Sequence, residues 1–452
     1  MISVHICPLT TSPDTQTAHT FIGTAGGVGA TLNGFDTLTG TSSLTDTLTI
    51  TDVATPAAIA LPVGLSLTNI EKLVINTAAS VGAQGTTVFD ASSFTSLTDI
   101  TANAYSAEGD DIKAAVTTNV IDTQHGGGAT VVGGKNVTVT AKGKISVTGA
   151  AGAVVVSDTD TSSSTVTVGT GTSVNVTSTA TGTVTVGGAT AALSPTGAIT
   201  ITDLAGGAIT AKGGTSVTVT AANSAVTVGG ASTVSPSGAV SVTQSYLGLA
   251  GDVTINGGNG VTVTTTGGGA AAAISVGATT AATGAVVITD TNSGVSADAI
   301  TVNGGSTVTI TTTPTSAAIN VGAAATLNAA GTALATANAA GEATGAVIIN
   351  NSKASFTNLG VANTTYGAGT ATVITNGSTS VSVTGGASNV ITDAQTTLAT
   401  GGTGVGVAIG TSTLATVSLT GITSAATVTS NALATGLATI KWTHQEAITF
   451  SC

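Results

Sequence analysis

Four short strand-like phrases recur in a fixed order through most of this chain. Copies of the first phrase, Gly-Gly-Thr-Ser-Val-Thr-Val-Thr, include the segments 213–220, 257–264 and 304–311. Equivalent valines in these copies, Val217, Val261 and Val308, are 44 and 47 residues apart. Because the order is kept while the spacing drifts by a few residues, the pattern indicates repeated structural units joined by loops of variable length.

The other three phrases are equally short. They read Ala-Val-Thr-Val-Gly-Gly at 225–230, Gly-Ala-Ile-Thr-Ile-Thr-Asp at 197–203 and Asp-Val-Thr-Ile-Asn-Gly-Gly at 252–258. In each phrase a β-branched apolar residue alternates with a polar residue, usually threonine, which predicts strands with one buried face and not helices. Glycine and Asn-Gly pairs between the phrases predict turns.

The core of such a chain has to be built from small side chains, because aromatic residues make up 2% of the sequence. Coils stacked about 4.8 Å apart satisfy this condition, since valine then stacks on valine and threonine on threonine. Four strands per repeat predict two coils of about 22 residues, each with two or three strands. We therefore predict an all-β fold, a β-solenoid like a parallel β-helix. The alternative is a row of small β-sandwich modules, which usually have longer strands and aromatic core residues.

The sequence predicts four stretches of different character: a polar leader at 1–20, an N-terminal β capping module at 21–128, a repetitive solenoid body at 129–430 and a C-terminal tail at 431–452. The capping module uses Leu and Ile where the body uses Ala and Val, as expected of an atypical terminal repeat. Within the body, only the alanine-rich stretch 323–343 suits a helix.

Charge and motif content exclude several functions. The net charge is −12 and all eight basic residues are lysine, which speaks against binding nucleic acid. No run of about 18 apolar residues predicts a transmembrane helix. The histidines His5, His19, His125 and His444 lack metal-ligand spacing, and no nucleophile or phosphate-loop motif is found, so we predict that the protein is not an enzyme.

Residues 33–77 contain phrases that occur together in one family. In order they read Phe-Asp-Thr-Leu-Thr-Gly-Thr-Ser-Ser at 35–43, Asp-Thr-Leu-Thr-Ile at 46–50, Leu-Pro-Val-Gly-Leu-Ser-Leu at 61–67 and Asn-Ile-Glu-Lys-Leu-Val-Ile-Asn-Thr at 69–77. This order resembles bacterial surface-layer (S-layer) proteins of the RTX-related, type I-secreted, Caulobacter-like group. The resemblance implies a secreted structural protein that tiles the cell surface as a lattice of its own copies held by calcium, next to cell-surface polysaccharide. The Gly-Gly-x-Gly-x-Asp calcium repeats of that family are not found, and the nearest match carries Thr262 at the aspartate position.

Two groups of carboxylates are candidate calcium ligands, because calcium binds several converging oxygens. They are Glu108 with Asp110 and Asp111, and Asp158 with Asp160. Four isolated aspartates at expected strand ends fit turn hydrogen bonds better, namely Asp203, Asp252, Asp290 and Asp298.

The sequence thus predicts an extracellular, self-assembling structural protein of a bacterial surface layer or surface filament, aided by calcium. A secreted adhesin or passenger-type stalk and a phage fibre are the alternatives, because both also use long repetitive β bodies.

Overall fold

The computed structural model describes most of the chain from Thr17 onward. The described residues are 17–26, 29–52, 58–246, 251–267, 272–292, 299–313, 318–322, 345–353, 365–366, 370–375, 379–385, 388–393, 414–420, 425–430, 439–443 and 448–451. The chain divides into two compact units, unit 1 (1–207) and unit 2 (208–452), and each is described by itself.

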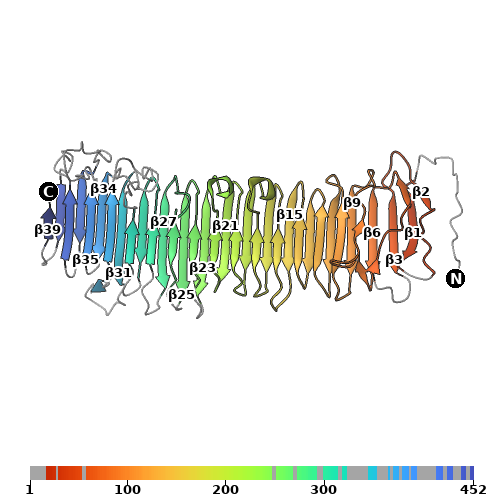
Figure 1. Ribbon diagram of the computed structural model, residues 1–452, viewed down its shortest axis with the longest axis horizontal. Helices are drawn as coiled ribbons and strands as arrows, with labels where there is room; N and C mark the ends of the chain where they lie inside the picture. Colours follow the sequence, from red (N-terminus) through yellow and green to blue (C-terminus); the bar gives the residue numbers. More distant parts are fainter. Residues whose placement is uncertain are drawn as a thin grey trace, which may run out of the picture. The chain divides into compact units, whose positions relative to one another are not determined.

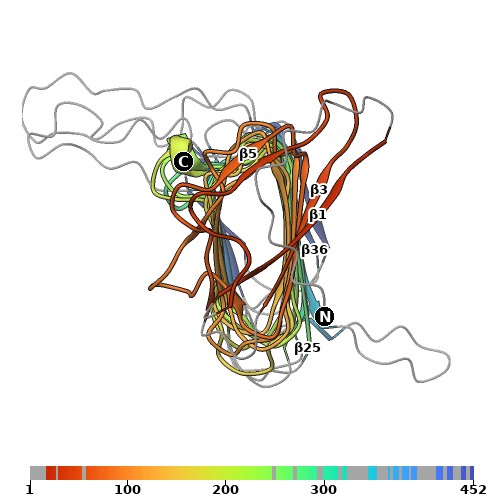
Figure 2. The same cartoon turned by 90° about the vertical axis from the view of Figure 1, so that its right-hand side faces the viewer.

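Unit 1 is a stack of coils in which two parallel sheets form opposite walls (Figures 1 and 2). The long-strand sheet contains β1 (Thr20–Ala25), β3 (Thr47–Asp52), β6 (Lys72–Thr77), β9 (Asp99–Ala104), β11 (Asn119–Gln124), β13 (Val137–Ala141), β15 (Ala153–Asp158), β17 (Ser173–Ser178) and β19 (Ala198–Asp203). The short-strand sheet contains β8 (Phe89–Asp90), β10 (Asp110–Ala114), β12 (Ala129–Gly133), β14 (Ile145–Thr148), β16 (Val166–Val168) and β18 (Val184–Val186). Strands of the two sheets alternate along the chain from β8 to β19, so each coil contributes one strand to each wall. The predicted β-solenoid is confirmed.

The core of unit 1 consists of side chains stacked in register. One inward rung joins Val137, Val154, Val174 and Ile199 of successive coils, and none of these side chains is more than 2% exposed. Each valine buried in this way contributes about 1.5–3 kcal/mol relative to an exposed one. The intervening residues point outward, so the period-two pattern of the sequence sets which side chains form the core.

The first coils of unit 1 have a heavier core and extra strands. Two small parallel pairs flank the walls, β2 (Thr37–Thr39) with β5 (Ser66–Thr68) and β4 (Ala58–Ile59) with β7 (Ser80–Val81). Fully buried leucine and isoleucine side chains are dense between Leu38 and Ile112, and the buried Phe89 lies among them. The sequence analysis placed the end of the capping module at residue 128. Strands β10 and β12, on either side of this residue, are paired in the same sheet, so the stack of coils continues through it.

Unit 2 repeats the two-walled coil. Its long-strand sheet contains β21 (Ser216–Ala222), β23 (Val240–Tyr246), β25 (Val261–Gly267), β27 (Val286–Asn292), β29 (Val308–Thr312), β31 (Val347–Lys353), β34 (Ser380–Gly385), β36 (Thr416–Thr420) and β38 (Thr439–Thr443). Its short-strand sheet contains β20 (Ile209–Ala211), β22 (Val226–Val228), β24 (Val253–Ile255), β26 (Ile274–Val276), β28 (Ala299–Val302), β30 (Ala318–Val321), β33 (Thr370–Thr375), β35 (Ser388–Asp393), β37 (Ala425–Ser430) and β39 (Ile448–Ser451). The strand β32 (Thr365–Tyr366) pairs antiparallel with β31.

The sequence repeat corresponds to two coils of unit 2. Copies of the first phrase form β21, β25 and β29, and copies of the third phrase form the intervening β23, β27 and β31. Val217, Val240, Val261, Val286 and Val308 therefore stack as one inward rung made alternately from the two phrases. The second and fourth phrases alternate in the same way along the short-strand sheet. The alanine-rich stretch 323–343, nearly all of the leader and much of the tail lie outside the described residues.

Candidate functional site

The acidic run at 108–111 is divided by the strand that carries part of it. Asp110 and Asp111 are neighbours in β10, so their side chains point to opposite faces of the sheet. Asp110 points into the solenoid interior and is 0% exposed, whereas the nearest donor to Asp111 Oδ2 is the Gly85 N–H at 3.4 Å. Glu108 precedes the strand and is exposed. The structure does not bring these three carboxylates together.

Asp110 faces Asp122 of β11 across the interior. Its Oδ1 atom accepts hydrogen bonds from the Val81 N–H at 2.8 Å and from Gln124 Nε2 at 3.0 Å. Burial raises the pKa of Asp110 to about 6, while burial together with the charge of Asp110 raises the pKa of Asp122 well above its ordinary value. The two carboxyl groups are within hydrogen-bonding reach of each other, and a proton held by Asp122 joins them. Apart from this contact with each other, Asp110 Oδ2 and both oxygens of Asp122 have no hydrogen-bond partner.

Asp158 and Asp160 are close in space, but serine and backbone groups already bind their oxygens. Asp158 ends β15 with its side chain buried, and its Oδ2 accepts from Ser164 Oγ at 2.8 Å and Ser178 Oγ at 3.1 Å. Asp158 Oδ1 accepts from the Asp160 N–H at 3.1 Å, and Asp160 Oδ2 accepts from Ser162 Oγ at 2.6 Å. Burial raises the pKa of Asp158, whereas the Ser162 hydroxyl lowers that of Asp160. These contacts organise the turn after β15.

The isolated aspartates also make turn or inter-coil contacts. Asp203 Oδ1 accepts from the Ala205 N–H at 3.1 Å, which is the expected turn bond. Asp252 Oδ1 accepts from the Ala273 N–H of the next coil at 2.9 Å, and Asp290 Oδ1 accepts from Thr265 Oγ1 at 2.7 Å. Asp298 lies outside the described residues.

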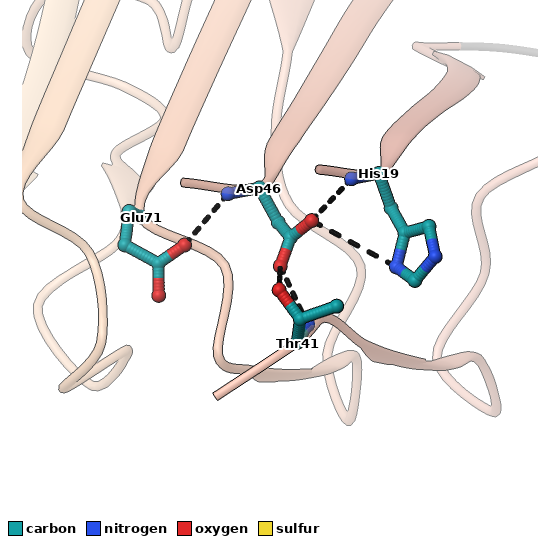
Figure 3. A network of polar contacts seen from close by, with 4 residues as sticks. All are labelled: His19, Thr41, Asp46 and Glu71. Atoms are coloured by element: carbon teal, nitrogen blue, oxygen red, sulfur yellow. Dashed lines mark hydrogen bonds and ion pairs between the residues drawn. The ribbon is translucent and has the colours of Figure 1, made fainter. Parts of the chain in front are cut away.

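A further carboxylate, Asp46, ties the first coils together (Figure 3). Its fully buried side chain accepts hydrogen bonds from the His19 N–H, the Thr41 N–H at 2.5 Å and Thr41 Oγ1 at 2.8 Å. Its own N–H donates to Glu71 Oε2 at 2.8 Å. Burial opposes ionisation, but these donors outweigh it and hold the pKa of Asp46 below its ordinary value. The network joins segments that are distant in sequence, so its role is structural.

The outer face of the long-strand sheet in unit 1 is uncharged along its middle. One outward rung consists of Ile22, Thr49, Val74, Thr101, Ile121, Thr138, Val155, Asn175 and Thr200. Ile22, Ile121 and Val155 are 68%, 48% and 42% exposed. The next outward rung carries only Thr, Asn and Ser. Aliphatic side chains therefore alternate along the first rung with threonine and asparagine to give a regular, uncharged surface.

Unit 2 has a similar outer face. Its corresponding rung consists of Thr218, Ser241, Thr262, Val287, Thr309, Ile348, Ser382 and Ser418, followed by Lys441. Val287 and Ile348 are 37% and 46% exposed. Each unit therefore presents hydroxyl and methyl groups at the regular spacing of a parallel sheet.

Two features are absent from the described part of the chain. It contains no group of three or more His, Cys, Asp or Glu side chains placed to hold a metal. Within the same residues, no helix has the length and apolar character needed to cross a membrane. No protein-family model matches the chain, and a comparison with curated proteins finds no match.

Among the buried polar residues, sequence reasoning missed Asp46, Ser80 and Asp122. A signal for Asp122 was present in the strand Asn119–Gln124. Asp122 is two residues after the inward-facing Val120, so the alternation of the strand predicts that Asp122 also faces inward. The same alternation could have shown that Asp110 and Asp111 diverge. Asp46 binds His19 of another coil as well as the nearby Thr41, and Ser80 pairs with Ala58 of another coil, so sequence spacing alone does not predict these contacts.

Proposed function

We propose that this chain is a structural subunit of a bacterial surface layer or surface filament, which assembles outside the cell with further copies of itself and with the help of calcium. The observation that carries the proposal is the uncharged outer face of the long-strand sheet with its exposed aliphatic residues. The phrases at 33–77 that resemble surface-layer proteins support it.

Charge explains why this face suits contact between copies. The chain has a net charge of −12, so copies repel one another wherever carboxylates meet. The middle of the outer face carries no charge, and its Val, Ile and Thr side chains are β-branched and lose little conformational freedom when they are covered. Calcium reduces the repulsion between the remaining carboxylates, which predicts assembly that depends on divalent cations.

Assembly can be tested with the purified full chain by sedimentation velocity and electron microscopy, in calcium and in chelator. We expect ordered sheets or filaments in calcium and dispersal in chelator. Monomers under both conditions at high protein concentration would contradict the proposal, and a discrete trimer would favour a phage fibre.

Two matched variants test which face makes the contact. Val155 lies on the outer face of the long-strand sheet, and Val132 lies on the outer face of the short-strand sheet with a similar exposure of 39%. Val155→Lys places a charge in the proposed contact and should prevent assembly, whereas Val132→Lys should assemble like the parent. Both variants should keep the parent circular dichroism spectrum, because neither side chain is in the core. Equal assembly of the two variants would remove the outer face from the proposal.

A further inference from the structure

Four buried side-chain oxygens in the described part of the chain have no hydrogen-bond partner. They are Ser80 Oγ, Asp110 Oδ2 and both carboxylate oxygens of Asp122. All three residues are 0% exposed. Buried polar atoms are nearly always paired, so these oxygens need either a proton shared between the carboxyl groups or a ligand from outside the chain.

The three residues come from elements that pack together. Asp110 accepts the N–H of Val81, the residue directly after Ser80, and the Asp110 carboxyl group faces that of Asp122. Strand β7 therefore lies against the side chain of Asp110 on one side, and β11 lies across the interior on the other. The set unites a hydroxyl group with two carboxylates, and it differs from the acidic run at 108–111.

None of the described residues around this pair supplies a positive charge. In the neighbouring coils the residues in register with Asp122 are Ala102 and Val139, and the residue in register with Asp110 is Ala129. Lys113 of β10 lies on the opposite face of the strand from Asp110. Its Nζ atom forms an ion pair with Asp90 at 2.8 Å on the outer surface. Two ionised carboxylates buried without a counter-charge are strongly unfavourable, so an external proton or cation has to balance them.

These two partners satisfy different numbers of oxygens. A single proton joins Asp110 Oδ2 to one oxygen of Asp122, and it leaves the other Asp122 oxygen and the Ser80 hydroxyl unpaired. A divalent cation balances both carboxylates and can bind their free oxygens, and the Ser80 hydroxyl adjoins Val81, whose N–H donates to Asp110. Asp110 Oδ1 already accepts two hydrogen bonds, so it is not needed as a ligand.

We propose that Ser80, Asp110 and Asp122 form an internal cation site that holds one calcium ion inside unit 1. Calcium accepts six to eight oxygen ligands in irregular arrangements, so carbonyl oxygens or a trapped water complete its shell. Magnesium fits less well, because it demands octahedral geometry and keeps several of its own waters. The proposal is independent of the surface role, since it concerns the fold of a single chain.

A site this deeply buried fills as the chain folds, so the test starts from unfolded protein. The full chain is denatured in chelator, refolded with or without calcium and dialysed, and bound calcium is measured by mass spectrometry on dispersed protein. We expect one calcium per chain that resists dialysis, a higher unfolding temperature and slower amide exchange in β7, β10 and β11.

Variants locate the ion. Asp122→Val introduces the residue that the next coil carries in register with Asp122, namely Val139. Asp122→Asn keeps the side-chain volume but removes the charge. Both should lose the retained calcium and the calcium-dependent rise in unfolding temperature. The control Asp160→Asn removes a carboxylate that is satisfied in a turn and should keep both.

Three results would overturn the proposal. The first is native protein that retains no calcium after refolding. The second is an Asp122→Asn variant that retains as much calcium as the parent. The third is an unfolding temperature that does not change with calcium but rises as the pH falls from 8 to 5. That result would show that Asp110 and Asp122 share a proton and not a cation. Because these readouts use dispersed chains, failure to assemble affects none of them.

Discussion

The alternation of inward and outward residues can be tested by exchanging two neighbours on β25. Val263 is 0% exposed and stacks between Val242 and Ile288. Its neighbour Thr264 points outward between Thr243 and Thr289 in the same ladder. Valine and threonine have nearly the same shape, so Val263→Thr and Thr264→Val each exchange one methyl group for one hydroxyl group or the reverse.

The two changes should differ in magnitude because only one of them buries a polar group. Val263→Thr places a hydroxyl in the dry core and should cost about 1–3 kcal/mol of local stability. Thr264→Val changes a surface position and should stay within about 0.5 kcal/mol of the parent. Val263→Ala removes two methyl groups at about 0.8 kcal/mol each and leaves a cavity, so it should cost about 2–3 kcal/mol.

A stacked-coil protein does not unfold as one two-state unit, so the assay has to be local. Amide hydrogen exchange of peptides from β23, β25 and β27 reports the opening free energy of these coils. A loss of 1–3 kcal/mol corresponds to roughly 5- to 150-fold faster exchange for Val263→Thr. If Thr264→Val accelerated exchange as much as Val263→Thr, the assignment of inner and outer faces would be wrong.

Two further predictions concern unit 1. A Cβ atom added at Gly182 would lie 1.7 Å from a backbone oxygen of the preceding coil, whereas one added at Gly169 would have no neighbour closer than 3.7 Å. Gly182→Ala should therefore destabilise these coils by about 1–3 kcal/mol, and the control Gly169→Ala should be close to neutral in thermal unfolding. Asp46→Asn removes a charged acceptor from the network of Figure 3 and should cost about 1–3 kcal/mol near pH 7. Because the pKa of Asp46 is lowered by folding, its contribution is complete above the ordinary value of 3.8 and is lost as the pH falls through the folded-state value. Exchange of the first coils should therefore converge for parent and variant in strong acid, and a difference that is constant with pH would refute this reasoning.

The repeat phrases were sufficient to predict the coil architecture because both of its determinants are local. Alternation in Gly-Gly-Thr-Ser-Val-Thr-Val-Thr selects the strand and its inner face, and the conserved order of the phrases selects stacking in register. The prediction of two coils per repeat follows from these facts alone. The number of strands in each coil did not, because two and three strands fit the same spacing.

The candidate sites were harder to predict because they depend on which coils meet. Successive coils differ in length, since Val120, Val137, Val154 and Val174 are separated by 17, 17 and 20 residues and still share one rung. The pairing of Asp110 with Asp122 depends on the turn between β10 and β11, which sequence spacing does not fix. Proximity in sequence instead suggested Asp110 with Asp111, which the strand separates.

The central claim is that the outer face of the long-strand sheet joins copies of this protein. Cryo-electron microscopy of the material assembled in calcium would test it most directly, because density for the contact can be traced to individual strands. We expect neighbouring copies to meet over the rung that contains Ile121 and Val155, with these side chains covered. An ordered assembly in which this face remains open to solvent would contradict the claim.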